Sequence, residues 1–279
     1  MDLRRTRSRH STDSRRGLKR LDAIHRLETQ WGLRVGAPFE DGGTGSLVAP
    51  AVRHDGTRVV LKIGSPHMEA VHEADGLRFW DGDPTVRLLE VDTDLHAMLL
   101  ERCEPGMPLR CLPDPEQDAV IAAALHRLWR APVAPHPFRP LAVMLAAWAD
   151  EARAAAPTTA DAGLVAAGLR LFDELSRPSA DDVLLATDLH AGNVLSAGRR
   201  PWLVIDPKPF VGDRAYDVTQ HLLNCRERLL RDPDGTIGRV TDLAGVDRGR
   251  VRLWTFARAA AAPGDAWDGD MPAIARVLA

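Results

Sequence analysis

The chain has 279 residues, which is enough for one large domain or two packed lobes with a substantial core. An apolar content of 45% is ordinary for a globular protein and argues against wholesale disorder. No apolar run is long enough to span a bilayer, and the N-terminus has no secretory-type hydrophobic segment, so we expect a cytoplasmic protein. Three cysteines without CxxC spacing fit reduced thiols.

Charge is distributed unevenly along the chain. The first 20 residues carry eight of the 36 basic side chains and two of the 39 acidic ones, so the remaining body has a net charge of −9. We interpret residues 1–16 as a disordered basic arm and not as a nucleic-acid or membrane tether, because no aromatic residues interleave with its arginines. An acidic body favours a cationic small-molecule partner and argues against a broad nucleic-acid surface.

The first hundred residues predict a small antiparallel sheet with one helix inserted. The expected strands are 33–39, 46–53, 57–63, 86–91 and 97–101. Leucine and isoleucine side chains at helical spacing predict a preceding helix over 17–30. Pro66 opens the inserted helix, which ends before Asp81. We assign an N-lobe to residues 17–103 and place the lobe boundary at the Pro105–Pro108 turn.

The remaining residues, 104–279, predict a larger and mainly helical C-lobe, which makes the fold class α+β with two lobes. The expected helices are 115–130, 139–156, 161–176, one beginning at Arg214, and 247–261. Short strands near 183–185, 194–196 and 203–205 interrupt the helices and surround the most informative polar residues of the chain.

Three oxygen-bearing side chains lie in and after these short strands. Asp188 and Asn193 are on a loop between two apolar strands, Gly192 is expected to permit an unusual backbone turn there, and Asp206 follows the next strand. Asp188 could orient a substrate hydroxyl, whereas Asn193 and Asp206 offer the hard oxygen ligands that Mg²⁺ prefers. An isolated Asp and Asn at this spacing would more often form a turn, but the strand–loop–strand context with Asp206 favours a metal–phosphate site.

Lysine is rare in this chain. The chain's lysines are Lys19, Lys62 and Lys208. Lys62 lies within an apolar strand and Lys208 lies two residues after Asp206, and both positions favour a compact ammonium over a guanidinium. A charged residue inside a strand needs a partner, and the next helix offers Glu73, with Glu69 kept open. Such a pair would hold Lys62 against nucleotide phosphates; a solvated edge-strand lysine is the alternative.

Two further segments could contact a nucleotide. The loop of residues 42–46 could cover phosphates with backbone N–H groups and with the hydroxyl of Ser46 or Thr44, although it is neither a Walker A loop nor a Rossmann fingerprint. The extended segment at the lobe junction could pair the main chain of Glu101 and Cys103 with an adenine edge.

Two aspartates after the second metal-ligand candidate look catalytic by composition, but structural roles are favoured for both. Asp213 suits the N-cap of the following helix, and Asp217 could brace the catalytic loop by accepting backbone N–H bonds. The histidines lack HxxxH spacing, so no zinc site is assigned.

Taken together, these segments resemble the aminoglycoside phosphotransferase superfamily, and more narrowly its streptomycin 6-kinase/hydroxyurea phosphotransferase branch. The residues that carry the resemblance are Val60–Lys62, His72–Gly82, Leu99–Arg102, Asp188–Leu195, and Trp202–Lys208 with Gly212–Asp217. The resemblance covers about residues 30–260, and it implies a bilobal protein-kinase-like fold and ATP-dependent phosphorylation of a small-molecule hydroxyl.

The resemblance also implies roles for individual residues. Asp188 is the expected catalytic aspartate, Asn193 and Asp206 are expected Mg²⁺ ligands, and Lys62 paired with Glu73 is expected to position the α- and β-phosphates. The superfamily often has His-Gly before its catalytic Asp, whereas this chain has Ala186-Thr187. An aminoglycoside such as streptomycin is a candidate acceptor; a kinase of an endogenous metabolite and a non-catalytic nucleotide-binding regulator are the alternatives.

Overall fold

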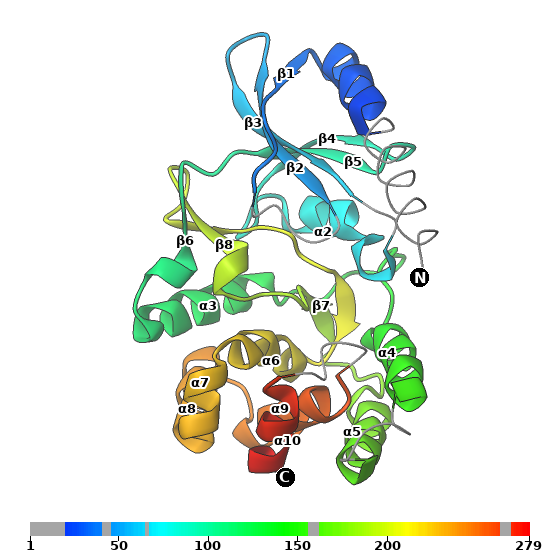
Figure 1. Cartoon of the computed structure of the whole chain (residues 1–279), viewed down its shortest axis with the longest axis vertical. Helices are drawn as coiled ribbons and strands as arrows, with labels where there is room; N and C mark the ends of the chain where they lie inside the picture. Colours follow the sequence, from blue (N-terminus) through cyan, green and yellow to red (C-terminus); the bar gives the residue numbers. More distant parts are fainter. Residues whose placement is uncertain (1–19, 41–45, 65–66, 156–161, 263–268) are drawn as a thin grey trace, which may run out of the picture. The chain divides into compact units, whose positions relative to one another are not determined.

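The computed structural model describes residues 20–40, 46–64, 67–155, 162–262 and 269–279, so the basic arm of residues 1–16 and the glycines of the 42–46 loop lie outside it. The chain forms two compact units (Figure 1). Unit 1 is drawn from residues 1–66 and 87–102, and unit 2 from residues 67–86 and 103–279. The fold is therefore α+β with two units, each with its own core.

Unit 1 is a five-stranded antiparallel sheet with a helix over residues 20–31. In sheet order its strands are β1 (Leu33–Val35), β2 (Leu47–Arg53), β3 (Arg58–Ile63), β5 (Ala97–Glu101) and β4 (Leu88–Asp92). Alternating residues of these strands face a core that also takes Leu27 from the helix. Lys62 lies in the central strand, opposite Val48 on one side and Met98 on the other.

Unit 2 is mainly helical. Its helices after the lobe boundary are α3 (Asp114–Leu128), α4 (Leu141–Ala155), α5 (Ala162–Leu175), α6 (Arg214–Asn224), α7 (Arg226–Arg231), α8 (Pro233–Ala244), α9 (Arg248–Ala260) and α10 (Met271–Leu278). Two small antiparallel sheets carry the polar loops: β6 (Pro105–Pro108) with β8 (Val194–Ala197) and β9 (Trp202–Val204), and β7 (Val183–Leu185) with β10 (Phe210–Gly212).

The inserted helix belongs to unit 2 by its contacts, whereas the sequence placed it in the N-lobe. It consists of a short 3₁₀ turn, η1 (Met68–Ala70), followed by α2 (Glu73–Trp80). The Trp80 indole is fully buried and donates a 2.9 Å hydrogen bond to the carbonyl of Leu128. A Cβ on Gly76 would lie 2.4 Å from the Pro209 ring, so only glycine allows α2 to pack this closely on the segment after Asp206.

Most expected elements are present, and the described residues add two strands and two α-helices that were not predicted from the sequence. These are β6, β10, α8 and α10. The helix expected from Arg214 is divided at Cys225 into α6 and α7. None of the helices in the described part of the chain is both long and apolar enough to cross a membrane.

Candidate active site

The β8–β9 hairpin brings two of the predicted site residues to the same end of a small sheet. Val194 is paired with Val204, and the amide of Ile205 donates a 2.9 Å hydrogen bond to the carbonyl of Asn193. Asn193 therefore precedes β8 at the end where Asp206 follows β9. Asp206 has a φ of +52°, a left-handed conformation that aspartate tolerates better than most residues.

Asp188 lies on the loop between β7 and β8 and is tied directly to Asn193. The side-chain nitrogen Nδ2 of Asn193 donates to the backbone carbonyl of Asp188 at 3.0 Å and to the Oδ2 atom of Asp188 at 3.3 Å. Because that nitrogen faces Asp188, the carbonyl oxygen is the part of Asn193 that can ligate a cation. The structure thus brings together the two residues of this loop for which catalysis and metal binding were predicted.

The glycine of this loop is required for space and not for a left-handed turn, which corrects the expectation from sequence. Gly192 lies in a short 3₁₀ turn, η4 (Ala191–Asn193), and is not among the residues with positive φ. Its amide donates a 3.1 Å hydrogen bond to Nδ1 of His190. A Cβ on Gly192 would lie 2.7 Å from the His190 ring, so a larger residue would displace the imidazole.

Asp217 braces the loop that carries Asp188, as the sequence predicted. Its buried carboxylate accepts the amide hydrogens of Ala186 and Thr187, at 3.0 and 2.7 Å, and the indole N–H of Trp129 at 3.2 Å. Burial raises the pKa of Asp217 to about 6, and the N–H donors oppose that rise by stabilising the ionised form. Asp213 caps α6 through the amide of Ala215, which was also predicted.

Thr187 and Lys208 join the catalytic loop to the segment that carries Asp206. The Thr187 hydroxyl donates to the carbonyl of Lys208, and the amide of Lys208 donates to the carbonyl of Ala186 at 2.8 Å. Thr187 has a φ of +49°, which is rare for a β-branched residue and indicates that its surroundings hold it in a strained conformation.

The Lys208 ammonium is paired with one carboxylate of the site and acts electrostatically on the other. Its Nζ donates to Oδ1 of Asp206, and its side chain is 15% exposed. Burial raises the pKa of Asp188 to about 6; the Lys208 charge opposes this rise and the Asp206 charge adds to it. Lys208 is thus electrostatically coupled to both the predicted catalytic aspartate and a predicted metal ligand.

Two residues that sequence reasoning missed support Asp188 from the helices beneath. Gln220 on α6 donates a 2.7 Å hydrogen bond to Oδ1 of Asp188, and the buried Arg258 on α9 donates to Oε1 of Gln220. Gln220 follows Asp217 by three positions, so both side chains lie on one face of α6. An arginine within the alanine-rich run of α9 was a further signal, because a buried guanidinium needs polar partners.

Arg258 also connects Gln220 to α4 and to the segment of Glu69, which belong to the same unit. Its guanidinium lies 5.7 Å from the ring centre of Trp148, and the Trp148 indole donates a 3.0 Å hydrogen bond to Oε1 of Glu69. Glu69, the alternative partner considered for Lys62, is therefore engaged with α4 of unit 2. Asp150 on the same helix is exposed and paired with Arg153, as expected for a solvated helix face.

The residues predicted to bind nucleotide are divided between the two units. Ser46, Lys62 and Glu101 belong to unit 1, whereas Glu73 and Cys103 belong to unit 2. Lys62 and Glu73 are both buried, at 6% and 2% exposure, and their pairing stays a prediction. The amide of Glu101 already donates to the carbonyl of Arg87, so an adenine could not accept that hydrogen without displacing it.

The donor set fits one hard divalent cation held partly by a nucleotide. Within the residues that the structure covers, no group of three or more His, Cys, Asp or Glu side chains could hold a metal alone. Asn193 and Asp206 offer one neutral and one anionic oxygen at the same end of the hairpin. Mg²⁺ is usually bound by one or two such side chains, with phosphate oxygens and water completing its coordination.

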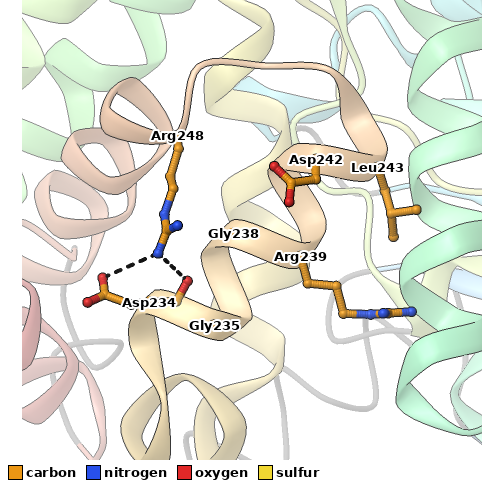
Figure 2. A pocket seen from close by; sticks show the side chains of 7 residues that line it. All are labelled: Asp234, Gly235, Gly238, Arg239, Asp242, Leu243 and Arg248. Carbon is orange, nitrogen blue, oxygen red and sulfur yellow. Dashed lines mark hydrogen bonds and ion pairs between the residues drawn. The ribbon is translucent and has the colours of Figure 1, made fainter.

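A second polar cluster in unit 2 involves none of the predicted site residues. Asp118 of α3 is fully buried and accepts hydrogen bonds from His221 and Arg239, at 2.8 and 3.0 Å, and two from Arg228 at 2.7 Å. Arg239 also lines a hollow of about 490 Å³ around α8. Figure 2 shows its side chain directed away from the Arg248–Asp234 pair on the other side of that hollow.

Comparison with known proteins decides the family. The model of the aminoglycoside/hydroxyurea antibiotic resistance kinases matches residues 35–270. The chain belongs to this family. Hydroxyurea phosphotransferase of Kitasatospora aureofaciens is 39% identical over 240 residues, which cover 82% of this chain and 68% of the relative. Streptomycin 6-kinase of Streptomyces griseus is 36% identical over 251 residues, which cover 84% of this chain and 79% of the relative.

Solved structures support a kinase-like fold for this member of the family. The choline kinase LicA from Streptococcus pneumoniae matches with a TM-score of 0.63 and 14% identity, over 93% of this chain and 97% of that one. Macrolide 2'-phosphotransferase type I matches with a TM-score of 0.58 and 17% identity, over 93% and 96% of the two chains. The protein is therefore a small-molecule phosphotransferase with a kinase-like α+β fold.

Proposed function

We propose that this kinase transfers the γ-phosphoryl group of Mg²⁺-bound ATP to a hydroxyl of a cationic small molecule, with an aminoglycoside such as streptomycin as the candidate acceptor. The observation that carries the proposal is the convergence of Asp188, Asn193 and Asp206 in unit 2. Asn193 is hydrogen-bonded to Asp188, and the β8–β9 hairpin places Asn193 and Asp206 at one end.

Asp188 orients the acceptor hydroxyl and receives its proton late in the reaction. The bond between the hydroxyl oxygen and the γ-phosphorus forms while the bond to the bridging oxygen breaks, and that electron pair leaves with ADP. Burial raises the pKa of Asp188 to about 6, which makes it a better proton acceptor than an exposed aspartate while leaving it ionised at neutral pH. Asn193 and Asp206 would hold Mg²⁺, which would neutralise charge on the phosphates.

Residues of both units would supply the nucleotide contacts. Lys62, central in its sheet and 6% exposed, has the position expected for a lysine that binds the α- and β-phosphates. Glu73 would hold the Lys62 ammonium, Ser46 would contribute its hydroxyl to the phosphate loop, and the main chain of Glu101 and Cys103 would face the adenine. Residues 17–103 and 104–279 are the proposed lobes.

The acceptor class rests on two considerations. The body of the chain is acidic, which attracts a polycationic aminoglycoside by long-range steering. Two streptomycin 6-kinases are among the relatives, at 36% and 37% identity, and a hydroxyurea phosphotransferase is another. A kinase of an endogenous metabolite is the second candidate, because the proposed roles of Asp188, Asn193 and Asp206 require only a hydroxyl on the acceptor.

The variant Asp188→Asn tests the proposed chemistry. We expect it to remove most transfer from ATP to streptomycin and to leave ADP affinity nearly unchanged, because the carboxylate acts on the acceptor and not on the nucleotide. Asp150→Asn is the matched control, because that side chain is 81% exposed. Wild-type turnover in Asp188→Asn would contradict the role of Asp188.

The acceptor itself is tested with a panel that includes streptomycin, hydroxyurea and hydroxylated amines from metabolism. Preferred turnover of streptomycin, together with raised streptomycin tolerance of cells that depends on Asp188, would support the aminoglycoside assignment. Preferred turnover of a metabolite without any change in drug tolerance would favour the second candidate. Nucleotide binding without transfer or hydrolysis would indicate a regulator instead.

A further inference from the structure

We infer that Lys208 is a second catalytic cation, which contacts the transferring phosphoryl group from the acceptor side of the site. This inference rests on the proposed function, and it adds a residue that is separate from the predicted phosphate-binding Lys62. It follows from how Lys208 is held, from which groups surround its ammonium, and from the use of lysine at this position.

The backbone of Lys208 is fixed to the catalytic loop from both sides. Its amide donates to the carbonyl of Ala186, and its carbonyl accepts the Thr187 hydroxyl at 2.6 Å. Both partners immediately precede Asp188, and Asp217 holds their own amides. The position of Lys208 relative to Asp188 is therefore set by four hydrogen bonds and not by an independent loop, which is the preorganisation that electrostatic catalysis needs.

The ammonium is paired with one of the two carboxylates of the proposed reaction and acts electrostatically on the other. Nζ donates to Asp206, the proposed metal ligand, and the Lys208 charge acts on Asp188, which orients the hydroxyl. During transfer, the phosphoryl group must pass from the metal-bound nucleotide to that hydroxyl. An ammonium has three N–H donors, and the contact with Asp206 uses one of them, so a phosphoryl oxygen can accept another.

The residue type supports the same conclusion. The chain uses 33 arginines and three lysines, yet it places a lysine here. Arginine has a planar guanidinium that tends to form a bidentate pair with one carboxylate. The lysine ammonium is a compact charge that can donate to a carboxylate and to a phosphoryl oxygen at the same time. Pro207 and Pro209 flank Lys208 and limit its backbone, and Pro209 packs against Gly76 of α2.

The test compares Lys208→Met with Lys208→Arg and with the surface control Arg153→Met. We expect Lys208→Met to lower kcat by about 100- to 1,000-fold, the range for loss of one preorganised donor to transition-state charge. The affinity for Mn²⁺–ADP, measured by calorimetry, should change by less than about threefold, because the contact forms with the transferring group. Lys208→Arg should recover little of the activity, and Arg153→Met should behave as wild type.

Sulfur substitution gives a second readout at the same atom. ATPγS replaces a non-bridging γ-oxygen by sulfur, which accepts hydrogen bonds poorly, so the ratio of ATP to ATPγS rates should fall in Lys208→Met relative to wild type. Lys208→Gln replaces Lys208→Met if the latter does not fold.

Three results would overturn the inference. One is a kcat of Lys208→Met close to wild type; another is a loss of Mn²⁺–ADP affinity that accounts for the whole loss of rate, which would make Lys208 only a support for Asp206. The third is a ratio of ATP to ATPγS rates that is the same in Lys208→Met as in the wild type. An inactive wild-type protein, or an active Asp188→Asn, would instead contradict the proposed function.

Discussion

The hydroxyl of Thr187 donates a 2.6 Å hydrogen bond to the backbone carbonyl of Lys208. This bond connects the loop of the predicted catalytic aspartate to the segment of the predicted metal ligand, at a position where the superfamily often has glycine. Thr187 also donates its amide hydrogen to Asp217. The Ala186-Thr187 pair is thus a supported part of the loop, held by its own set of hydrogen bonds.

The Thr187 hydroxyl can be tested by comparing Thr187→Val with Thr187→Ser. Valine keeps the shape but leaves the carbonyl of Lys208 without this donor, which should cost about 1–3 kcal/mol of unfolding free energy and lower kcat. Serine keeps the hydroxyl and should stay close to wild type in both quantities. Urea unfolding and steady-state kinetics measure them; equal behaviour of the two variants would show that the hydrogen bond is unimportant.

Asp217→Asn should loosen the catalytic loop. Asparagine has one acceptor oxygen, and its amide nitrogen would face a backbone N–H, so at least one buried donor loses its partner. We expect a loss of about 1–3 kcal/mol in stability. A fall of about tenfold or more in kcat should accompany it, because small displacements of a positioned group are costly.

The comparison variant for Asp217 is Asp213→Asn, which changes an aspartate on the same helix but keeps an N-capping side chain. Its carboxylate also accepts the Trp254 indole N–H and contacts Arg250, so some stability should be lost while kcat is retained. A normal kcat in Asp217→Asn would show that the loop keeps its geometry without the carboxylate.

Gln220 should affect the rate more than substrate affinity. Gln220→Leu removes the donor to Asp188 and one acceptor of the buried Arg258, so Asp188 should become less well oriented. We expect about a tenfold fall in kcat with little change in the KM for ATP. Gln220→Glu should be worse still, because it places a second negative charge beside Asp188. If both variants keep the wild-type kcat, Gln220 has only a packing role.

The Asp118 cluster predicts a fall in stability on the alkaline side of neutrality. Burial opposes charge on His221, but hydrogen bonding to Asp118 and contact with Cys225 raise its pKa to about 9. The unfolded chain has an ordinary histidine pKa of about 6.5, so the folded protein holds an additional proton between these values. The stabilisation is complete below pH 6.5 and is lost as pH rises through 9, by about 3 kcal/mol.

This pH dependence is best measured in a Cys225→Ser background. Burial opposes ionisation of the Cys225 thiol, yet contacts with His221 and Arg228 lower its pKa, which would make stability rise with pH and mask the effect. Urea unfolding of Cys225→Ser from pH 6 to 9.5 should show a smaller fall, because Asp118 still raises the pKa of His221 but the contact with Cys225 is lost. Cys225→Ser/His221→Asn should show a flatter profile. Parallel profiles would mean that His221 does not titrate there.

The predicted elements that carry local signals match the structure well. The bounds of the strand at 183–185 were predicted correctly, because a short apolar run between turn residues leaves little choice of where the strand begins and ends. Helices α3, α4, α5 and α9 agree within two residues at each end, since their apolar spacing is long and regular. The short β6 and β10 exist only because they pair with distant strands, and nothing local in Pro105–Pro108 indicates a strand.

The candidate site shows the same limit. Asp188, Asn193 and Asp206 could be proposed from sequence because their spacing is short and their side chains have specific chemistry, and their roles stay a prediction. Gln220 and Arg258 come from α6 and α9, and only the packing of those helices brings them to Asp188. The role of Gly192 was misjudged because the sequence does not show that the His190 ring occupies the space beside it.

Asp118 has a consequence for how the chain reaches its native state. Its bonds to His221, Arg228 and Arg239 close loops of 103, 110 and 121 residues. Contacts so distant in sequence form only after the intervening helices have come together, because loop closure must precede them. During synthesis, α3 therefore leaves the ribosome with an acidic side chain on its inner face whose three cationic partners have not yet been made.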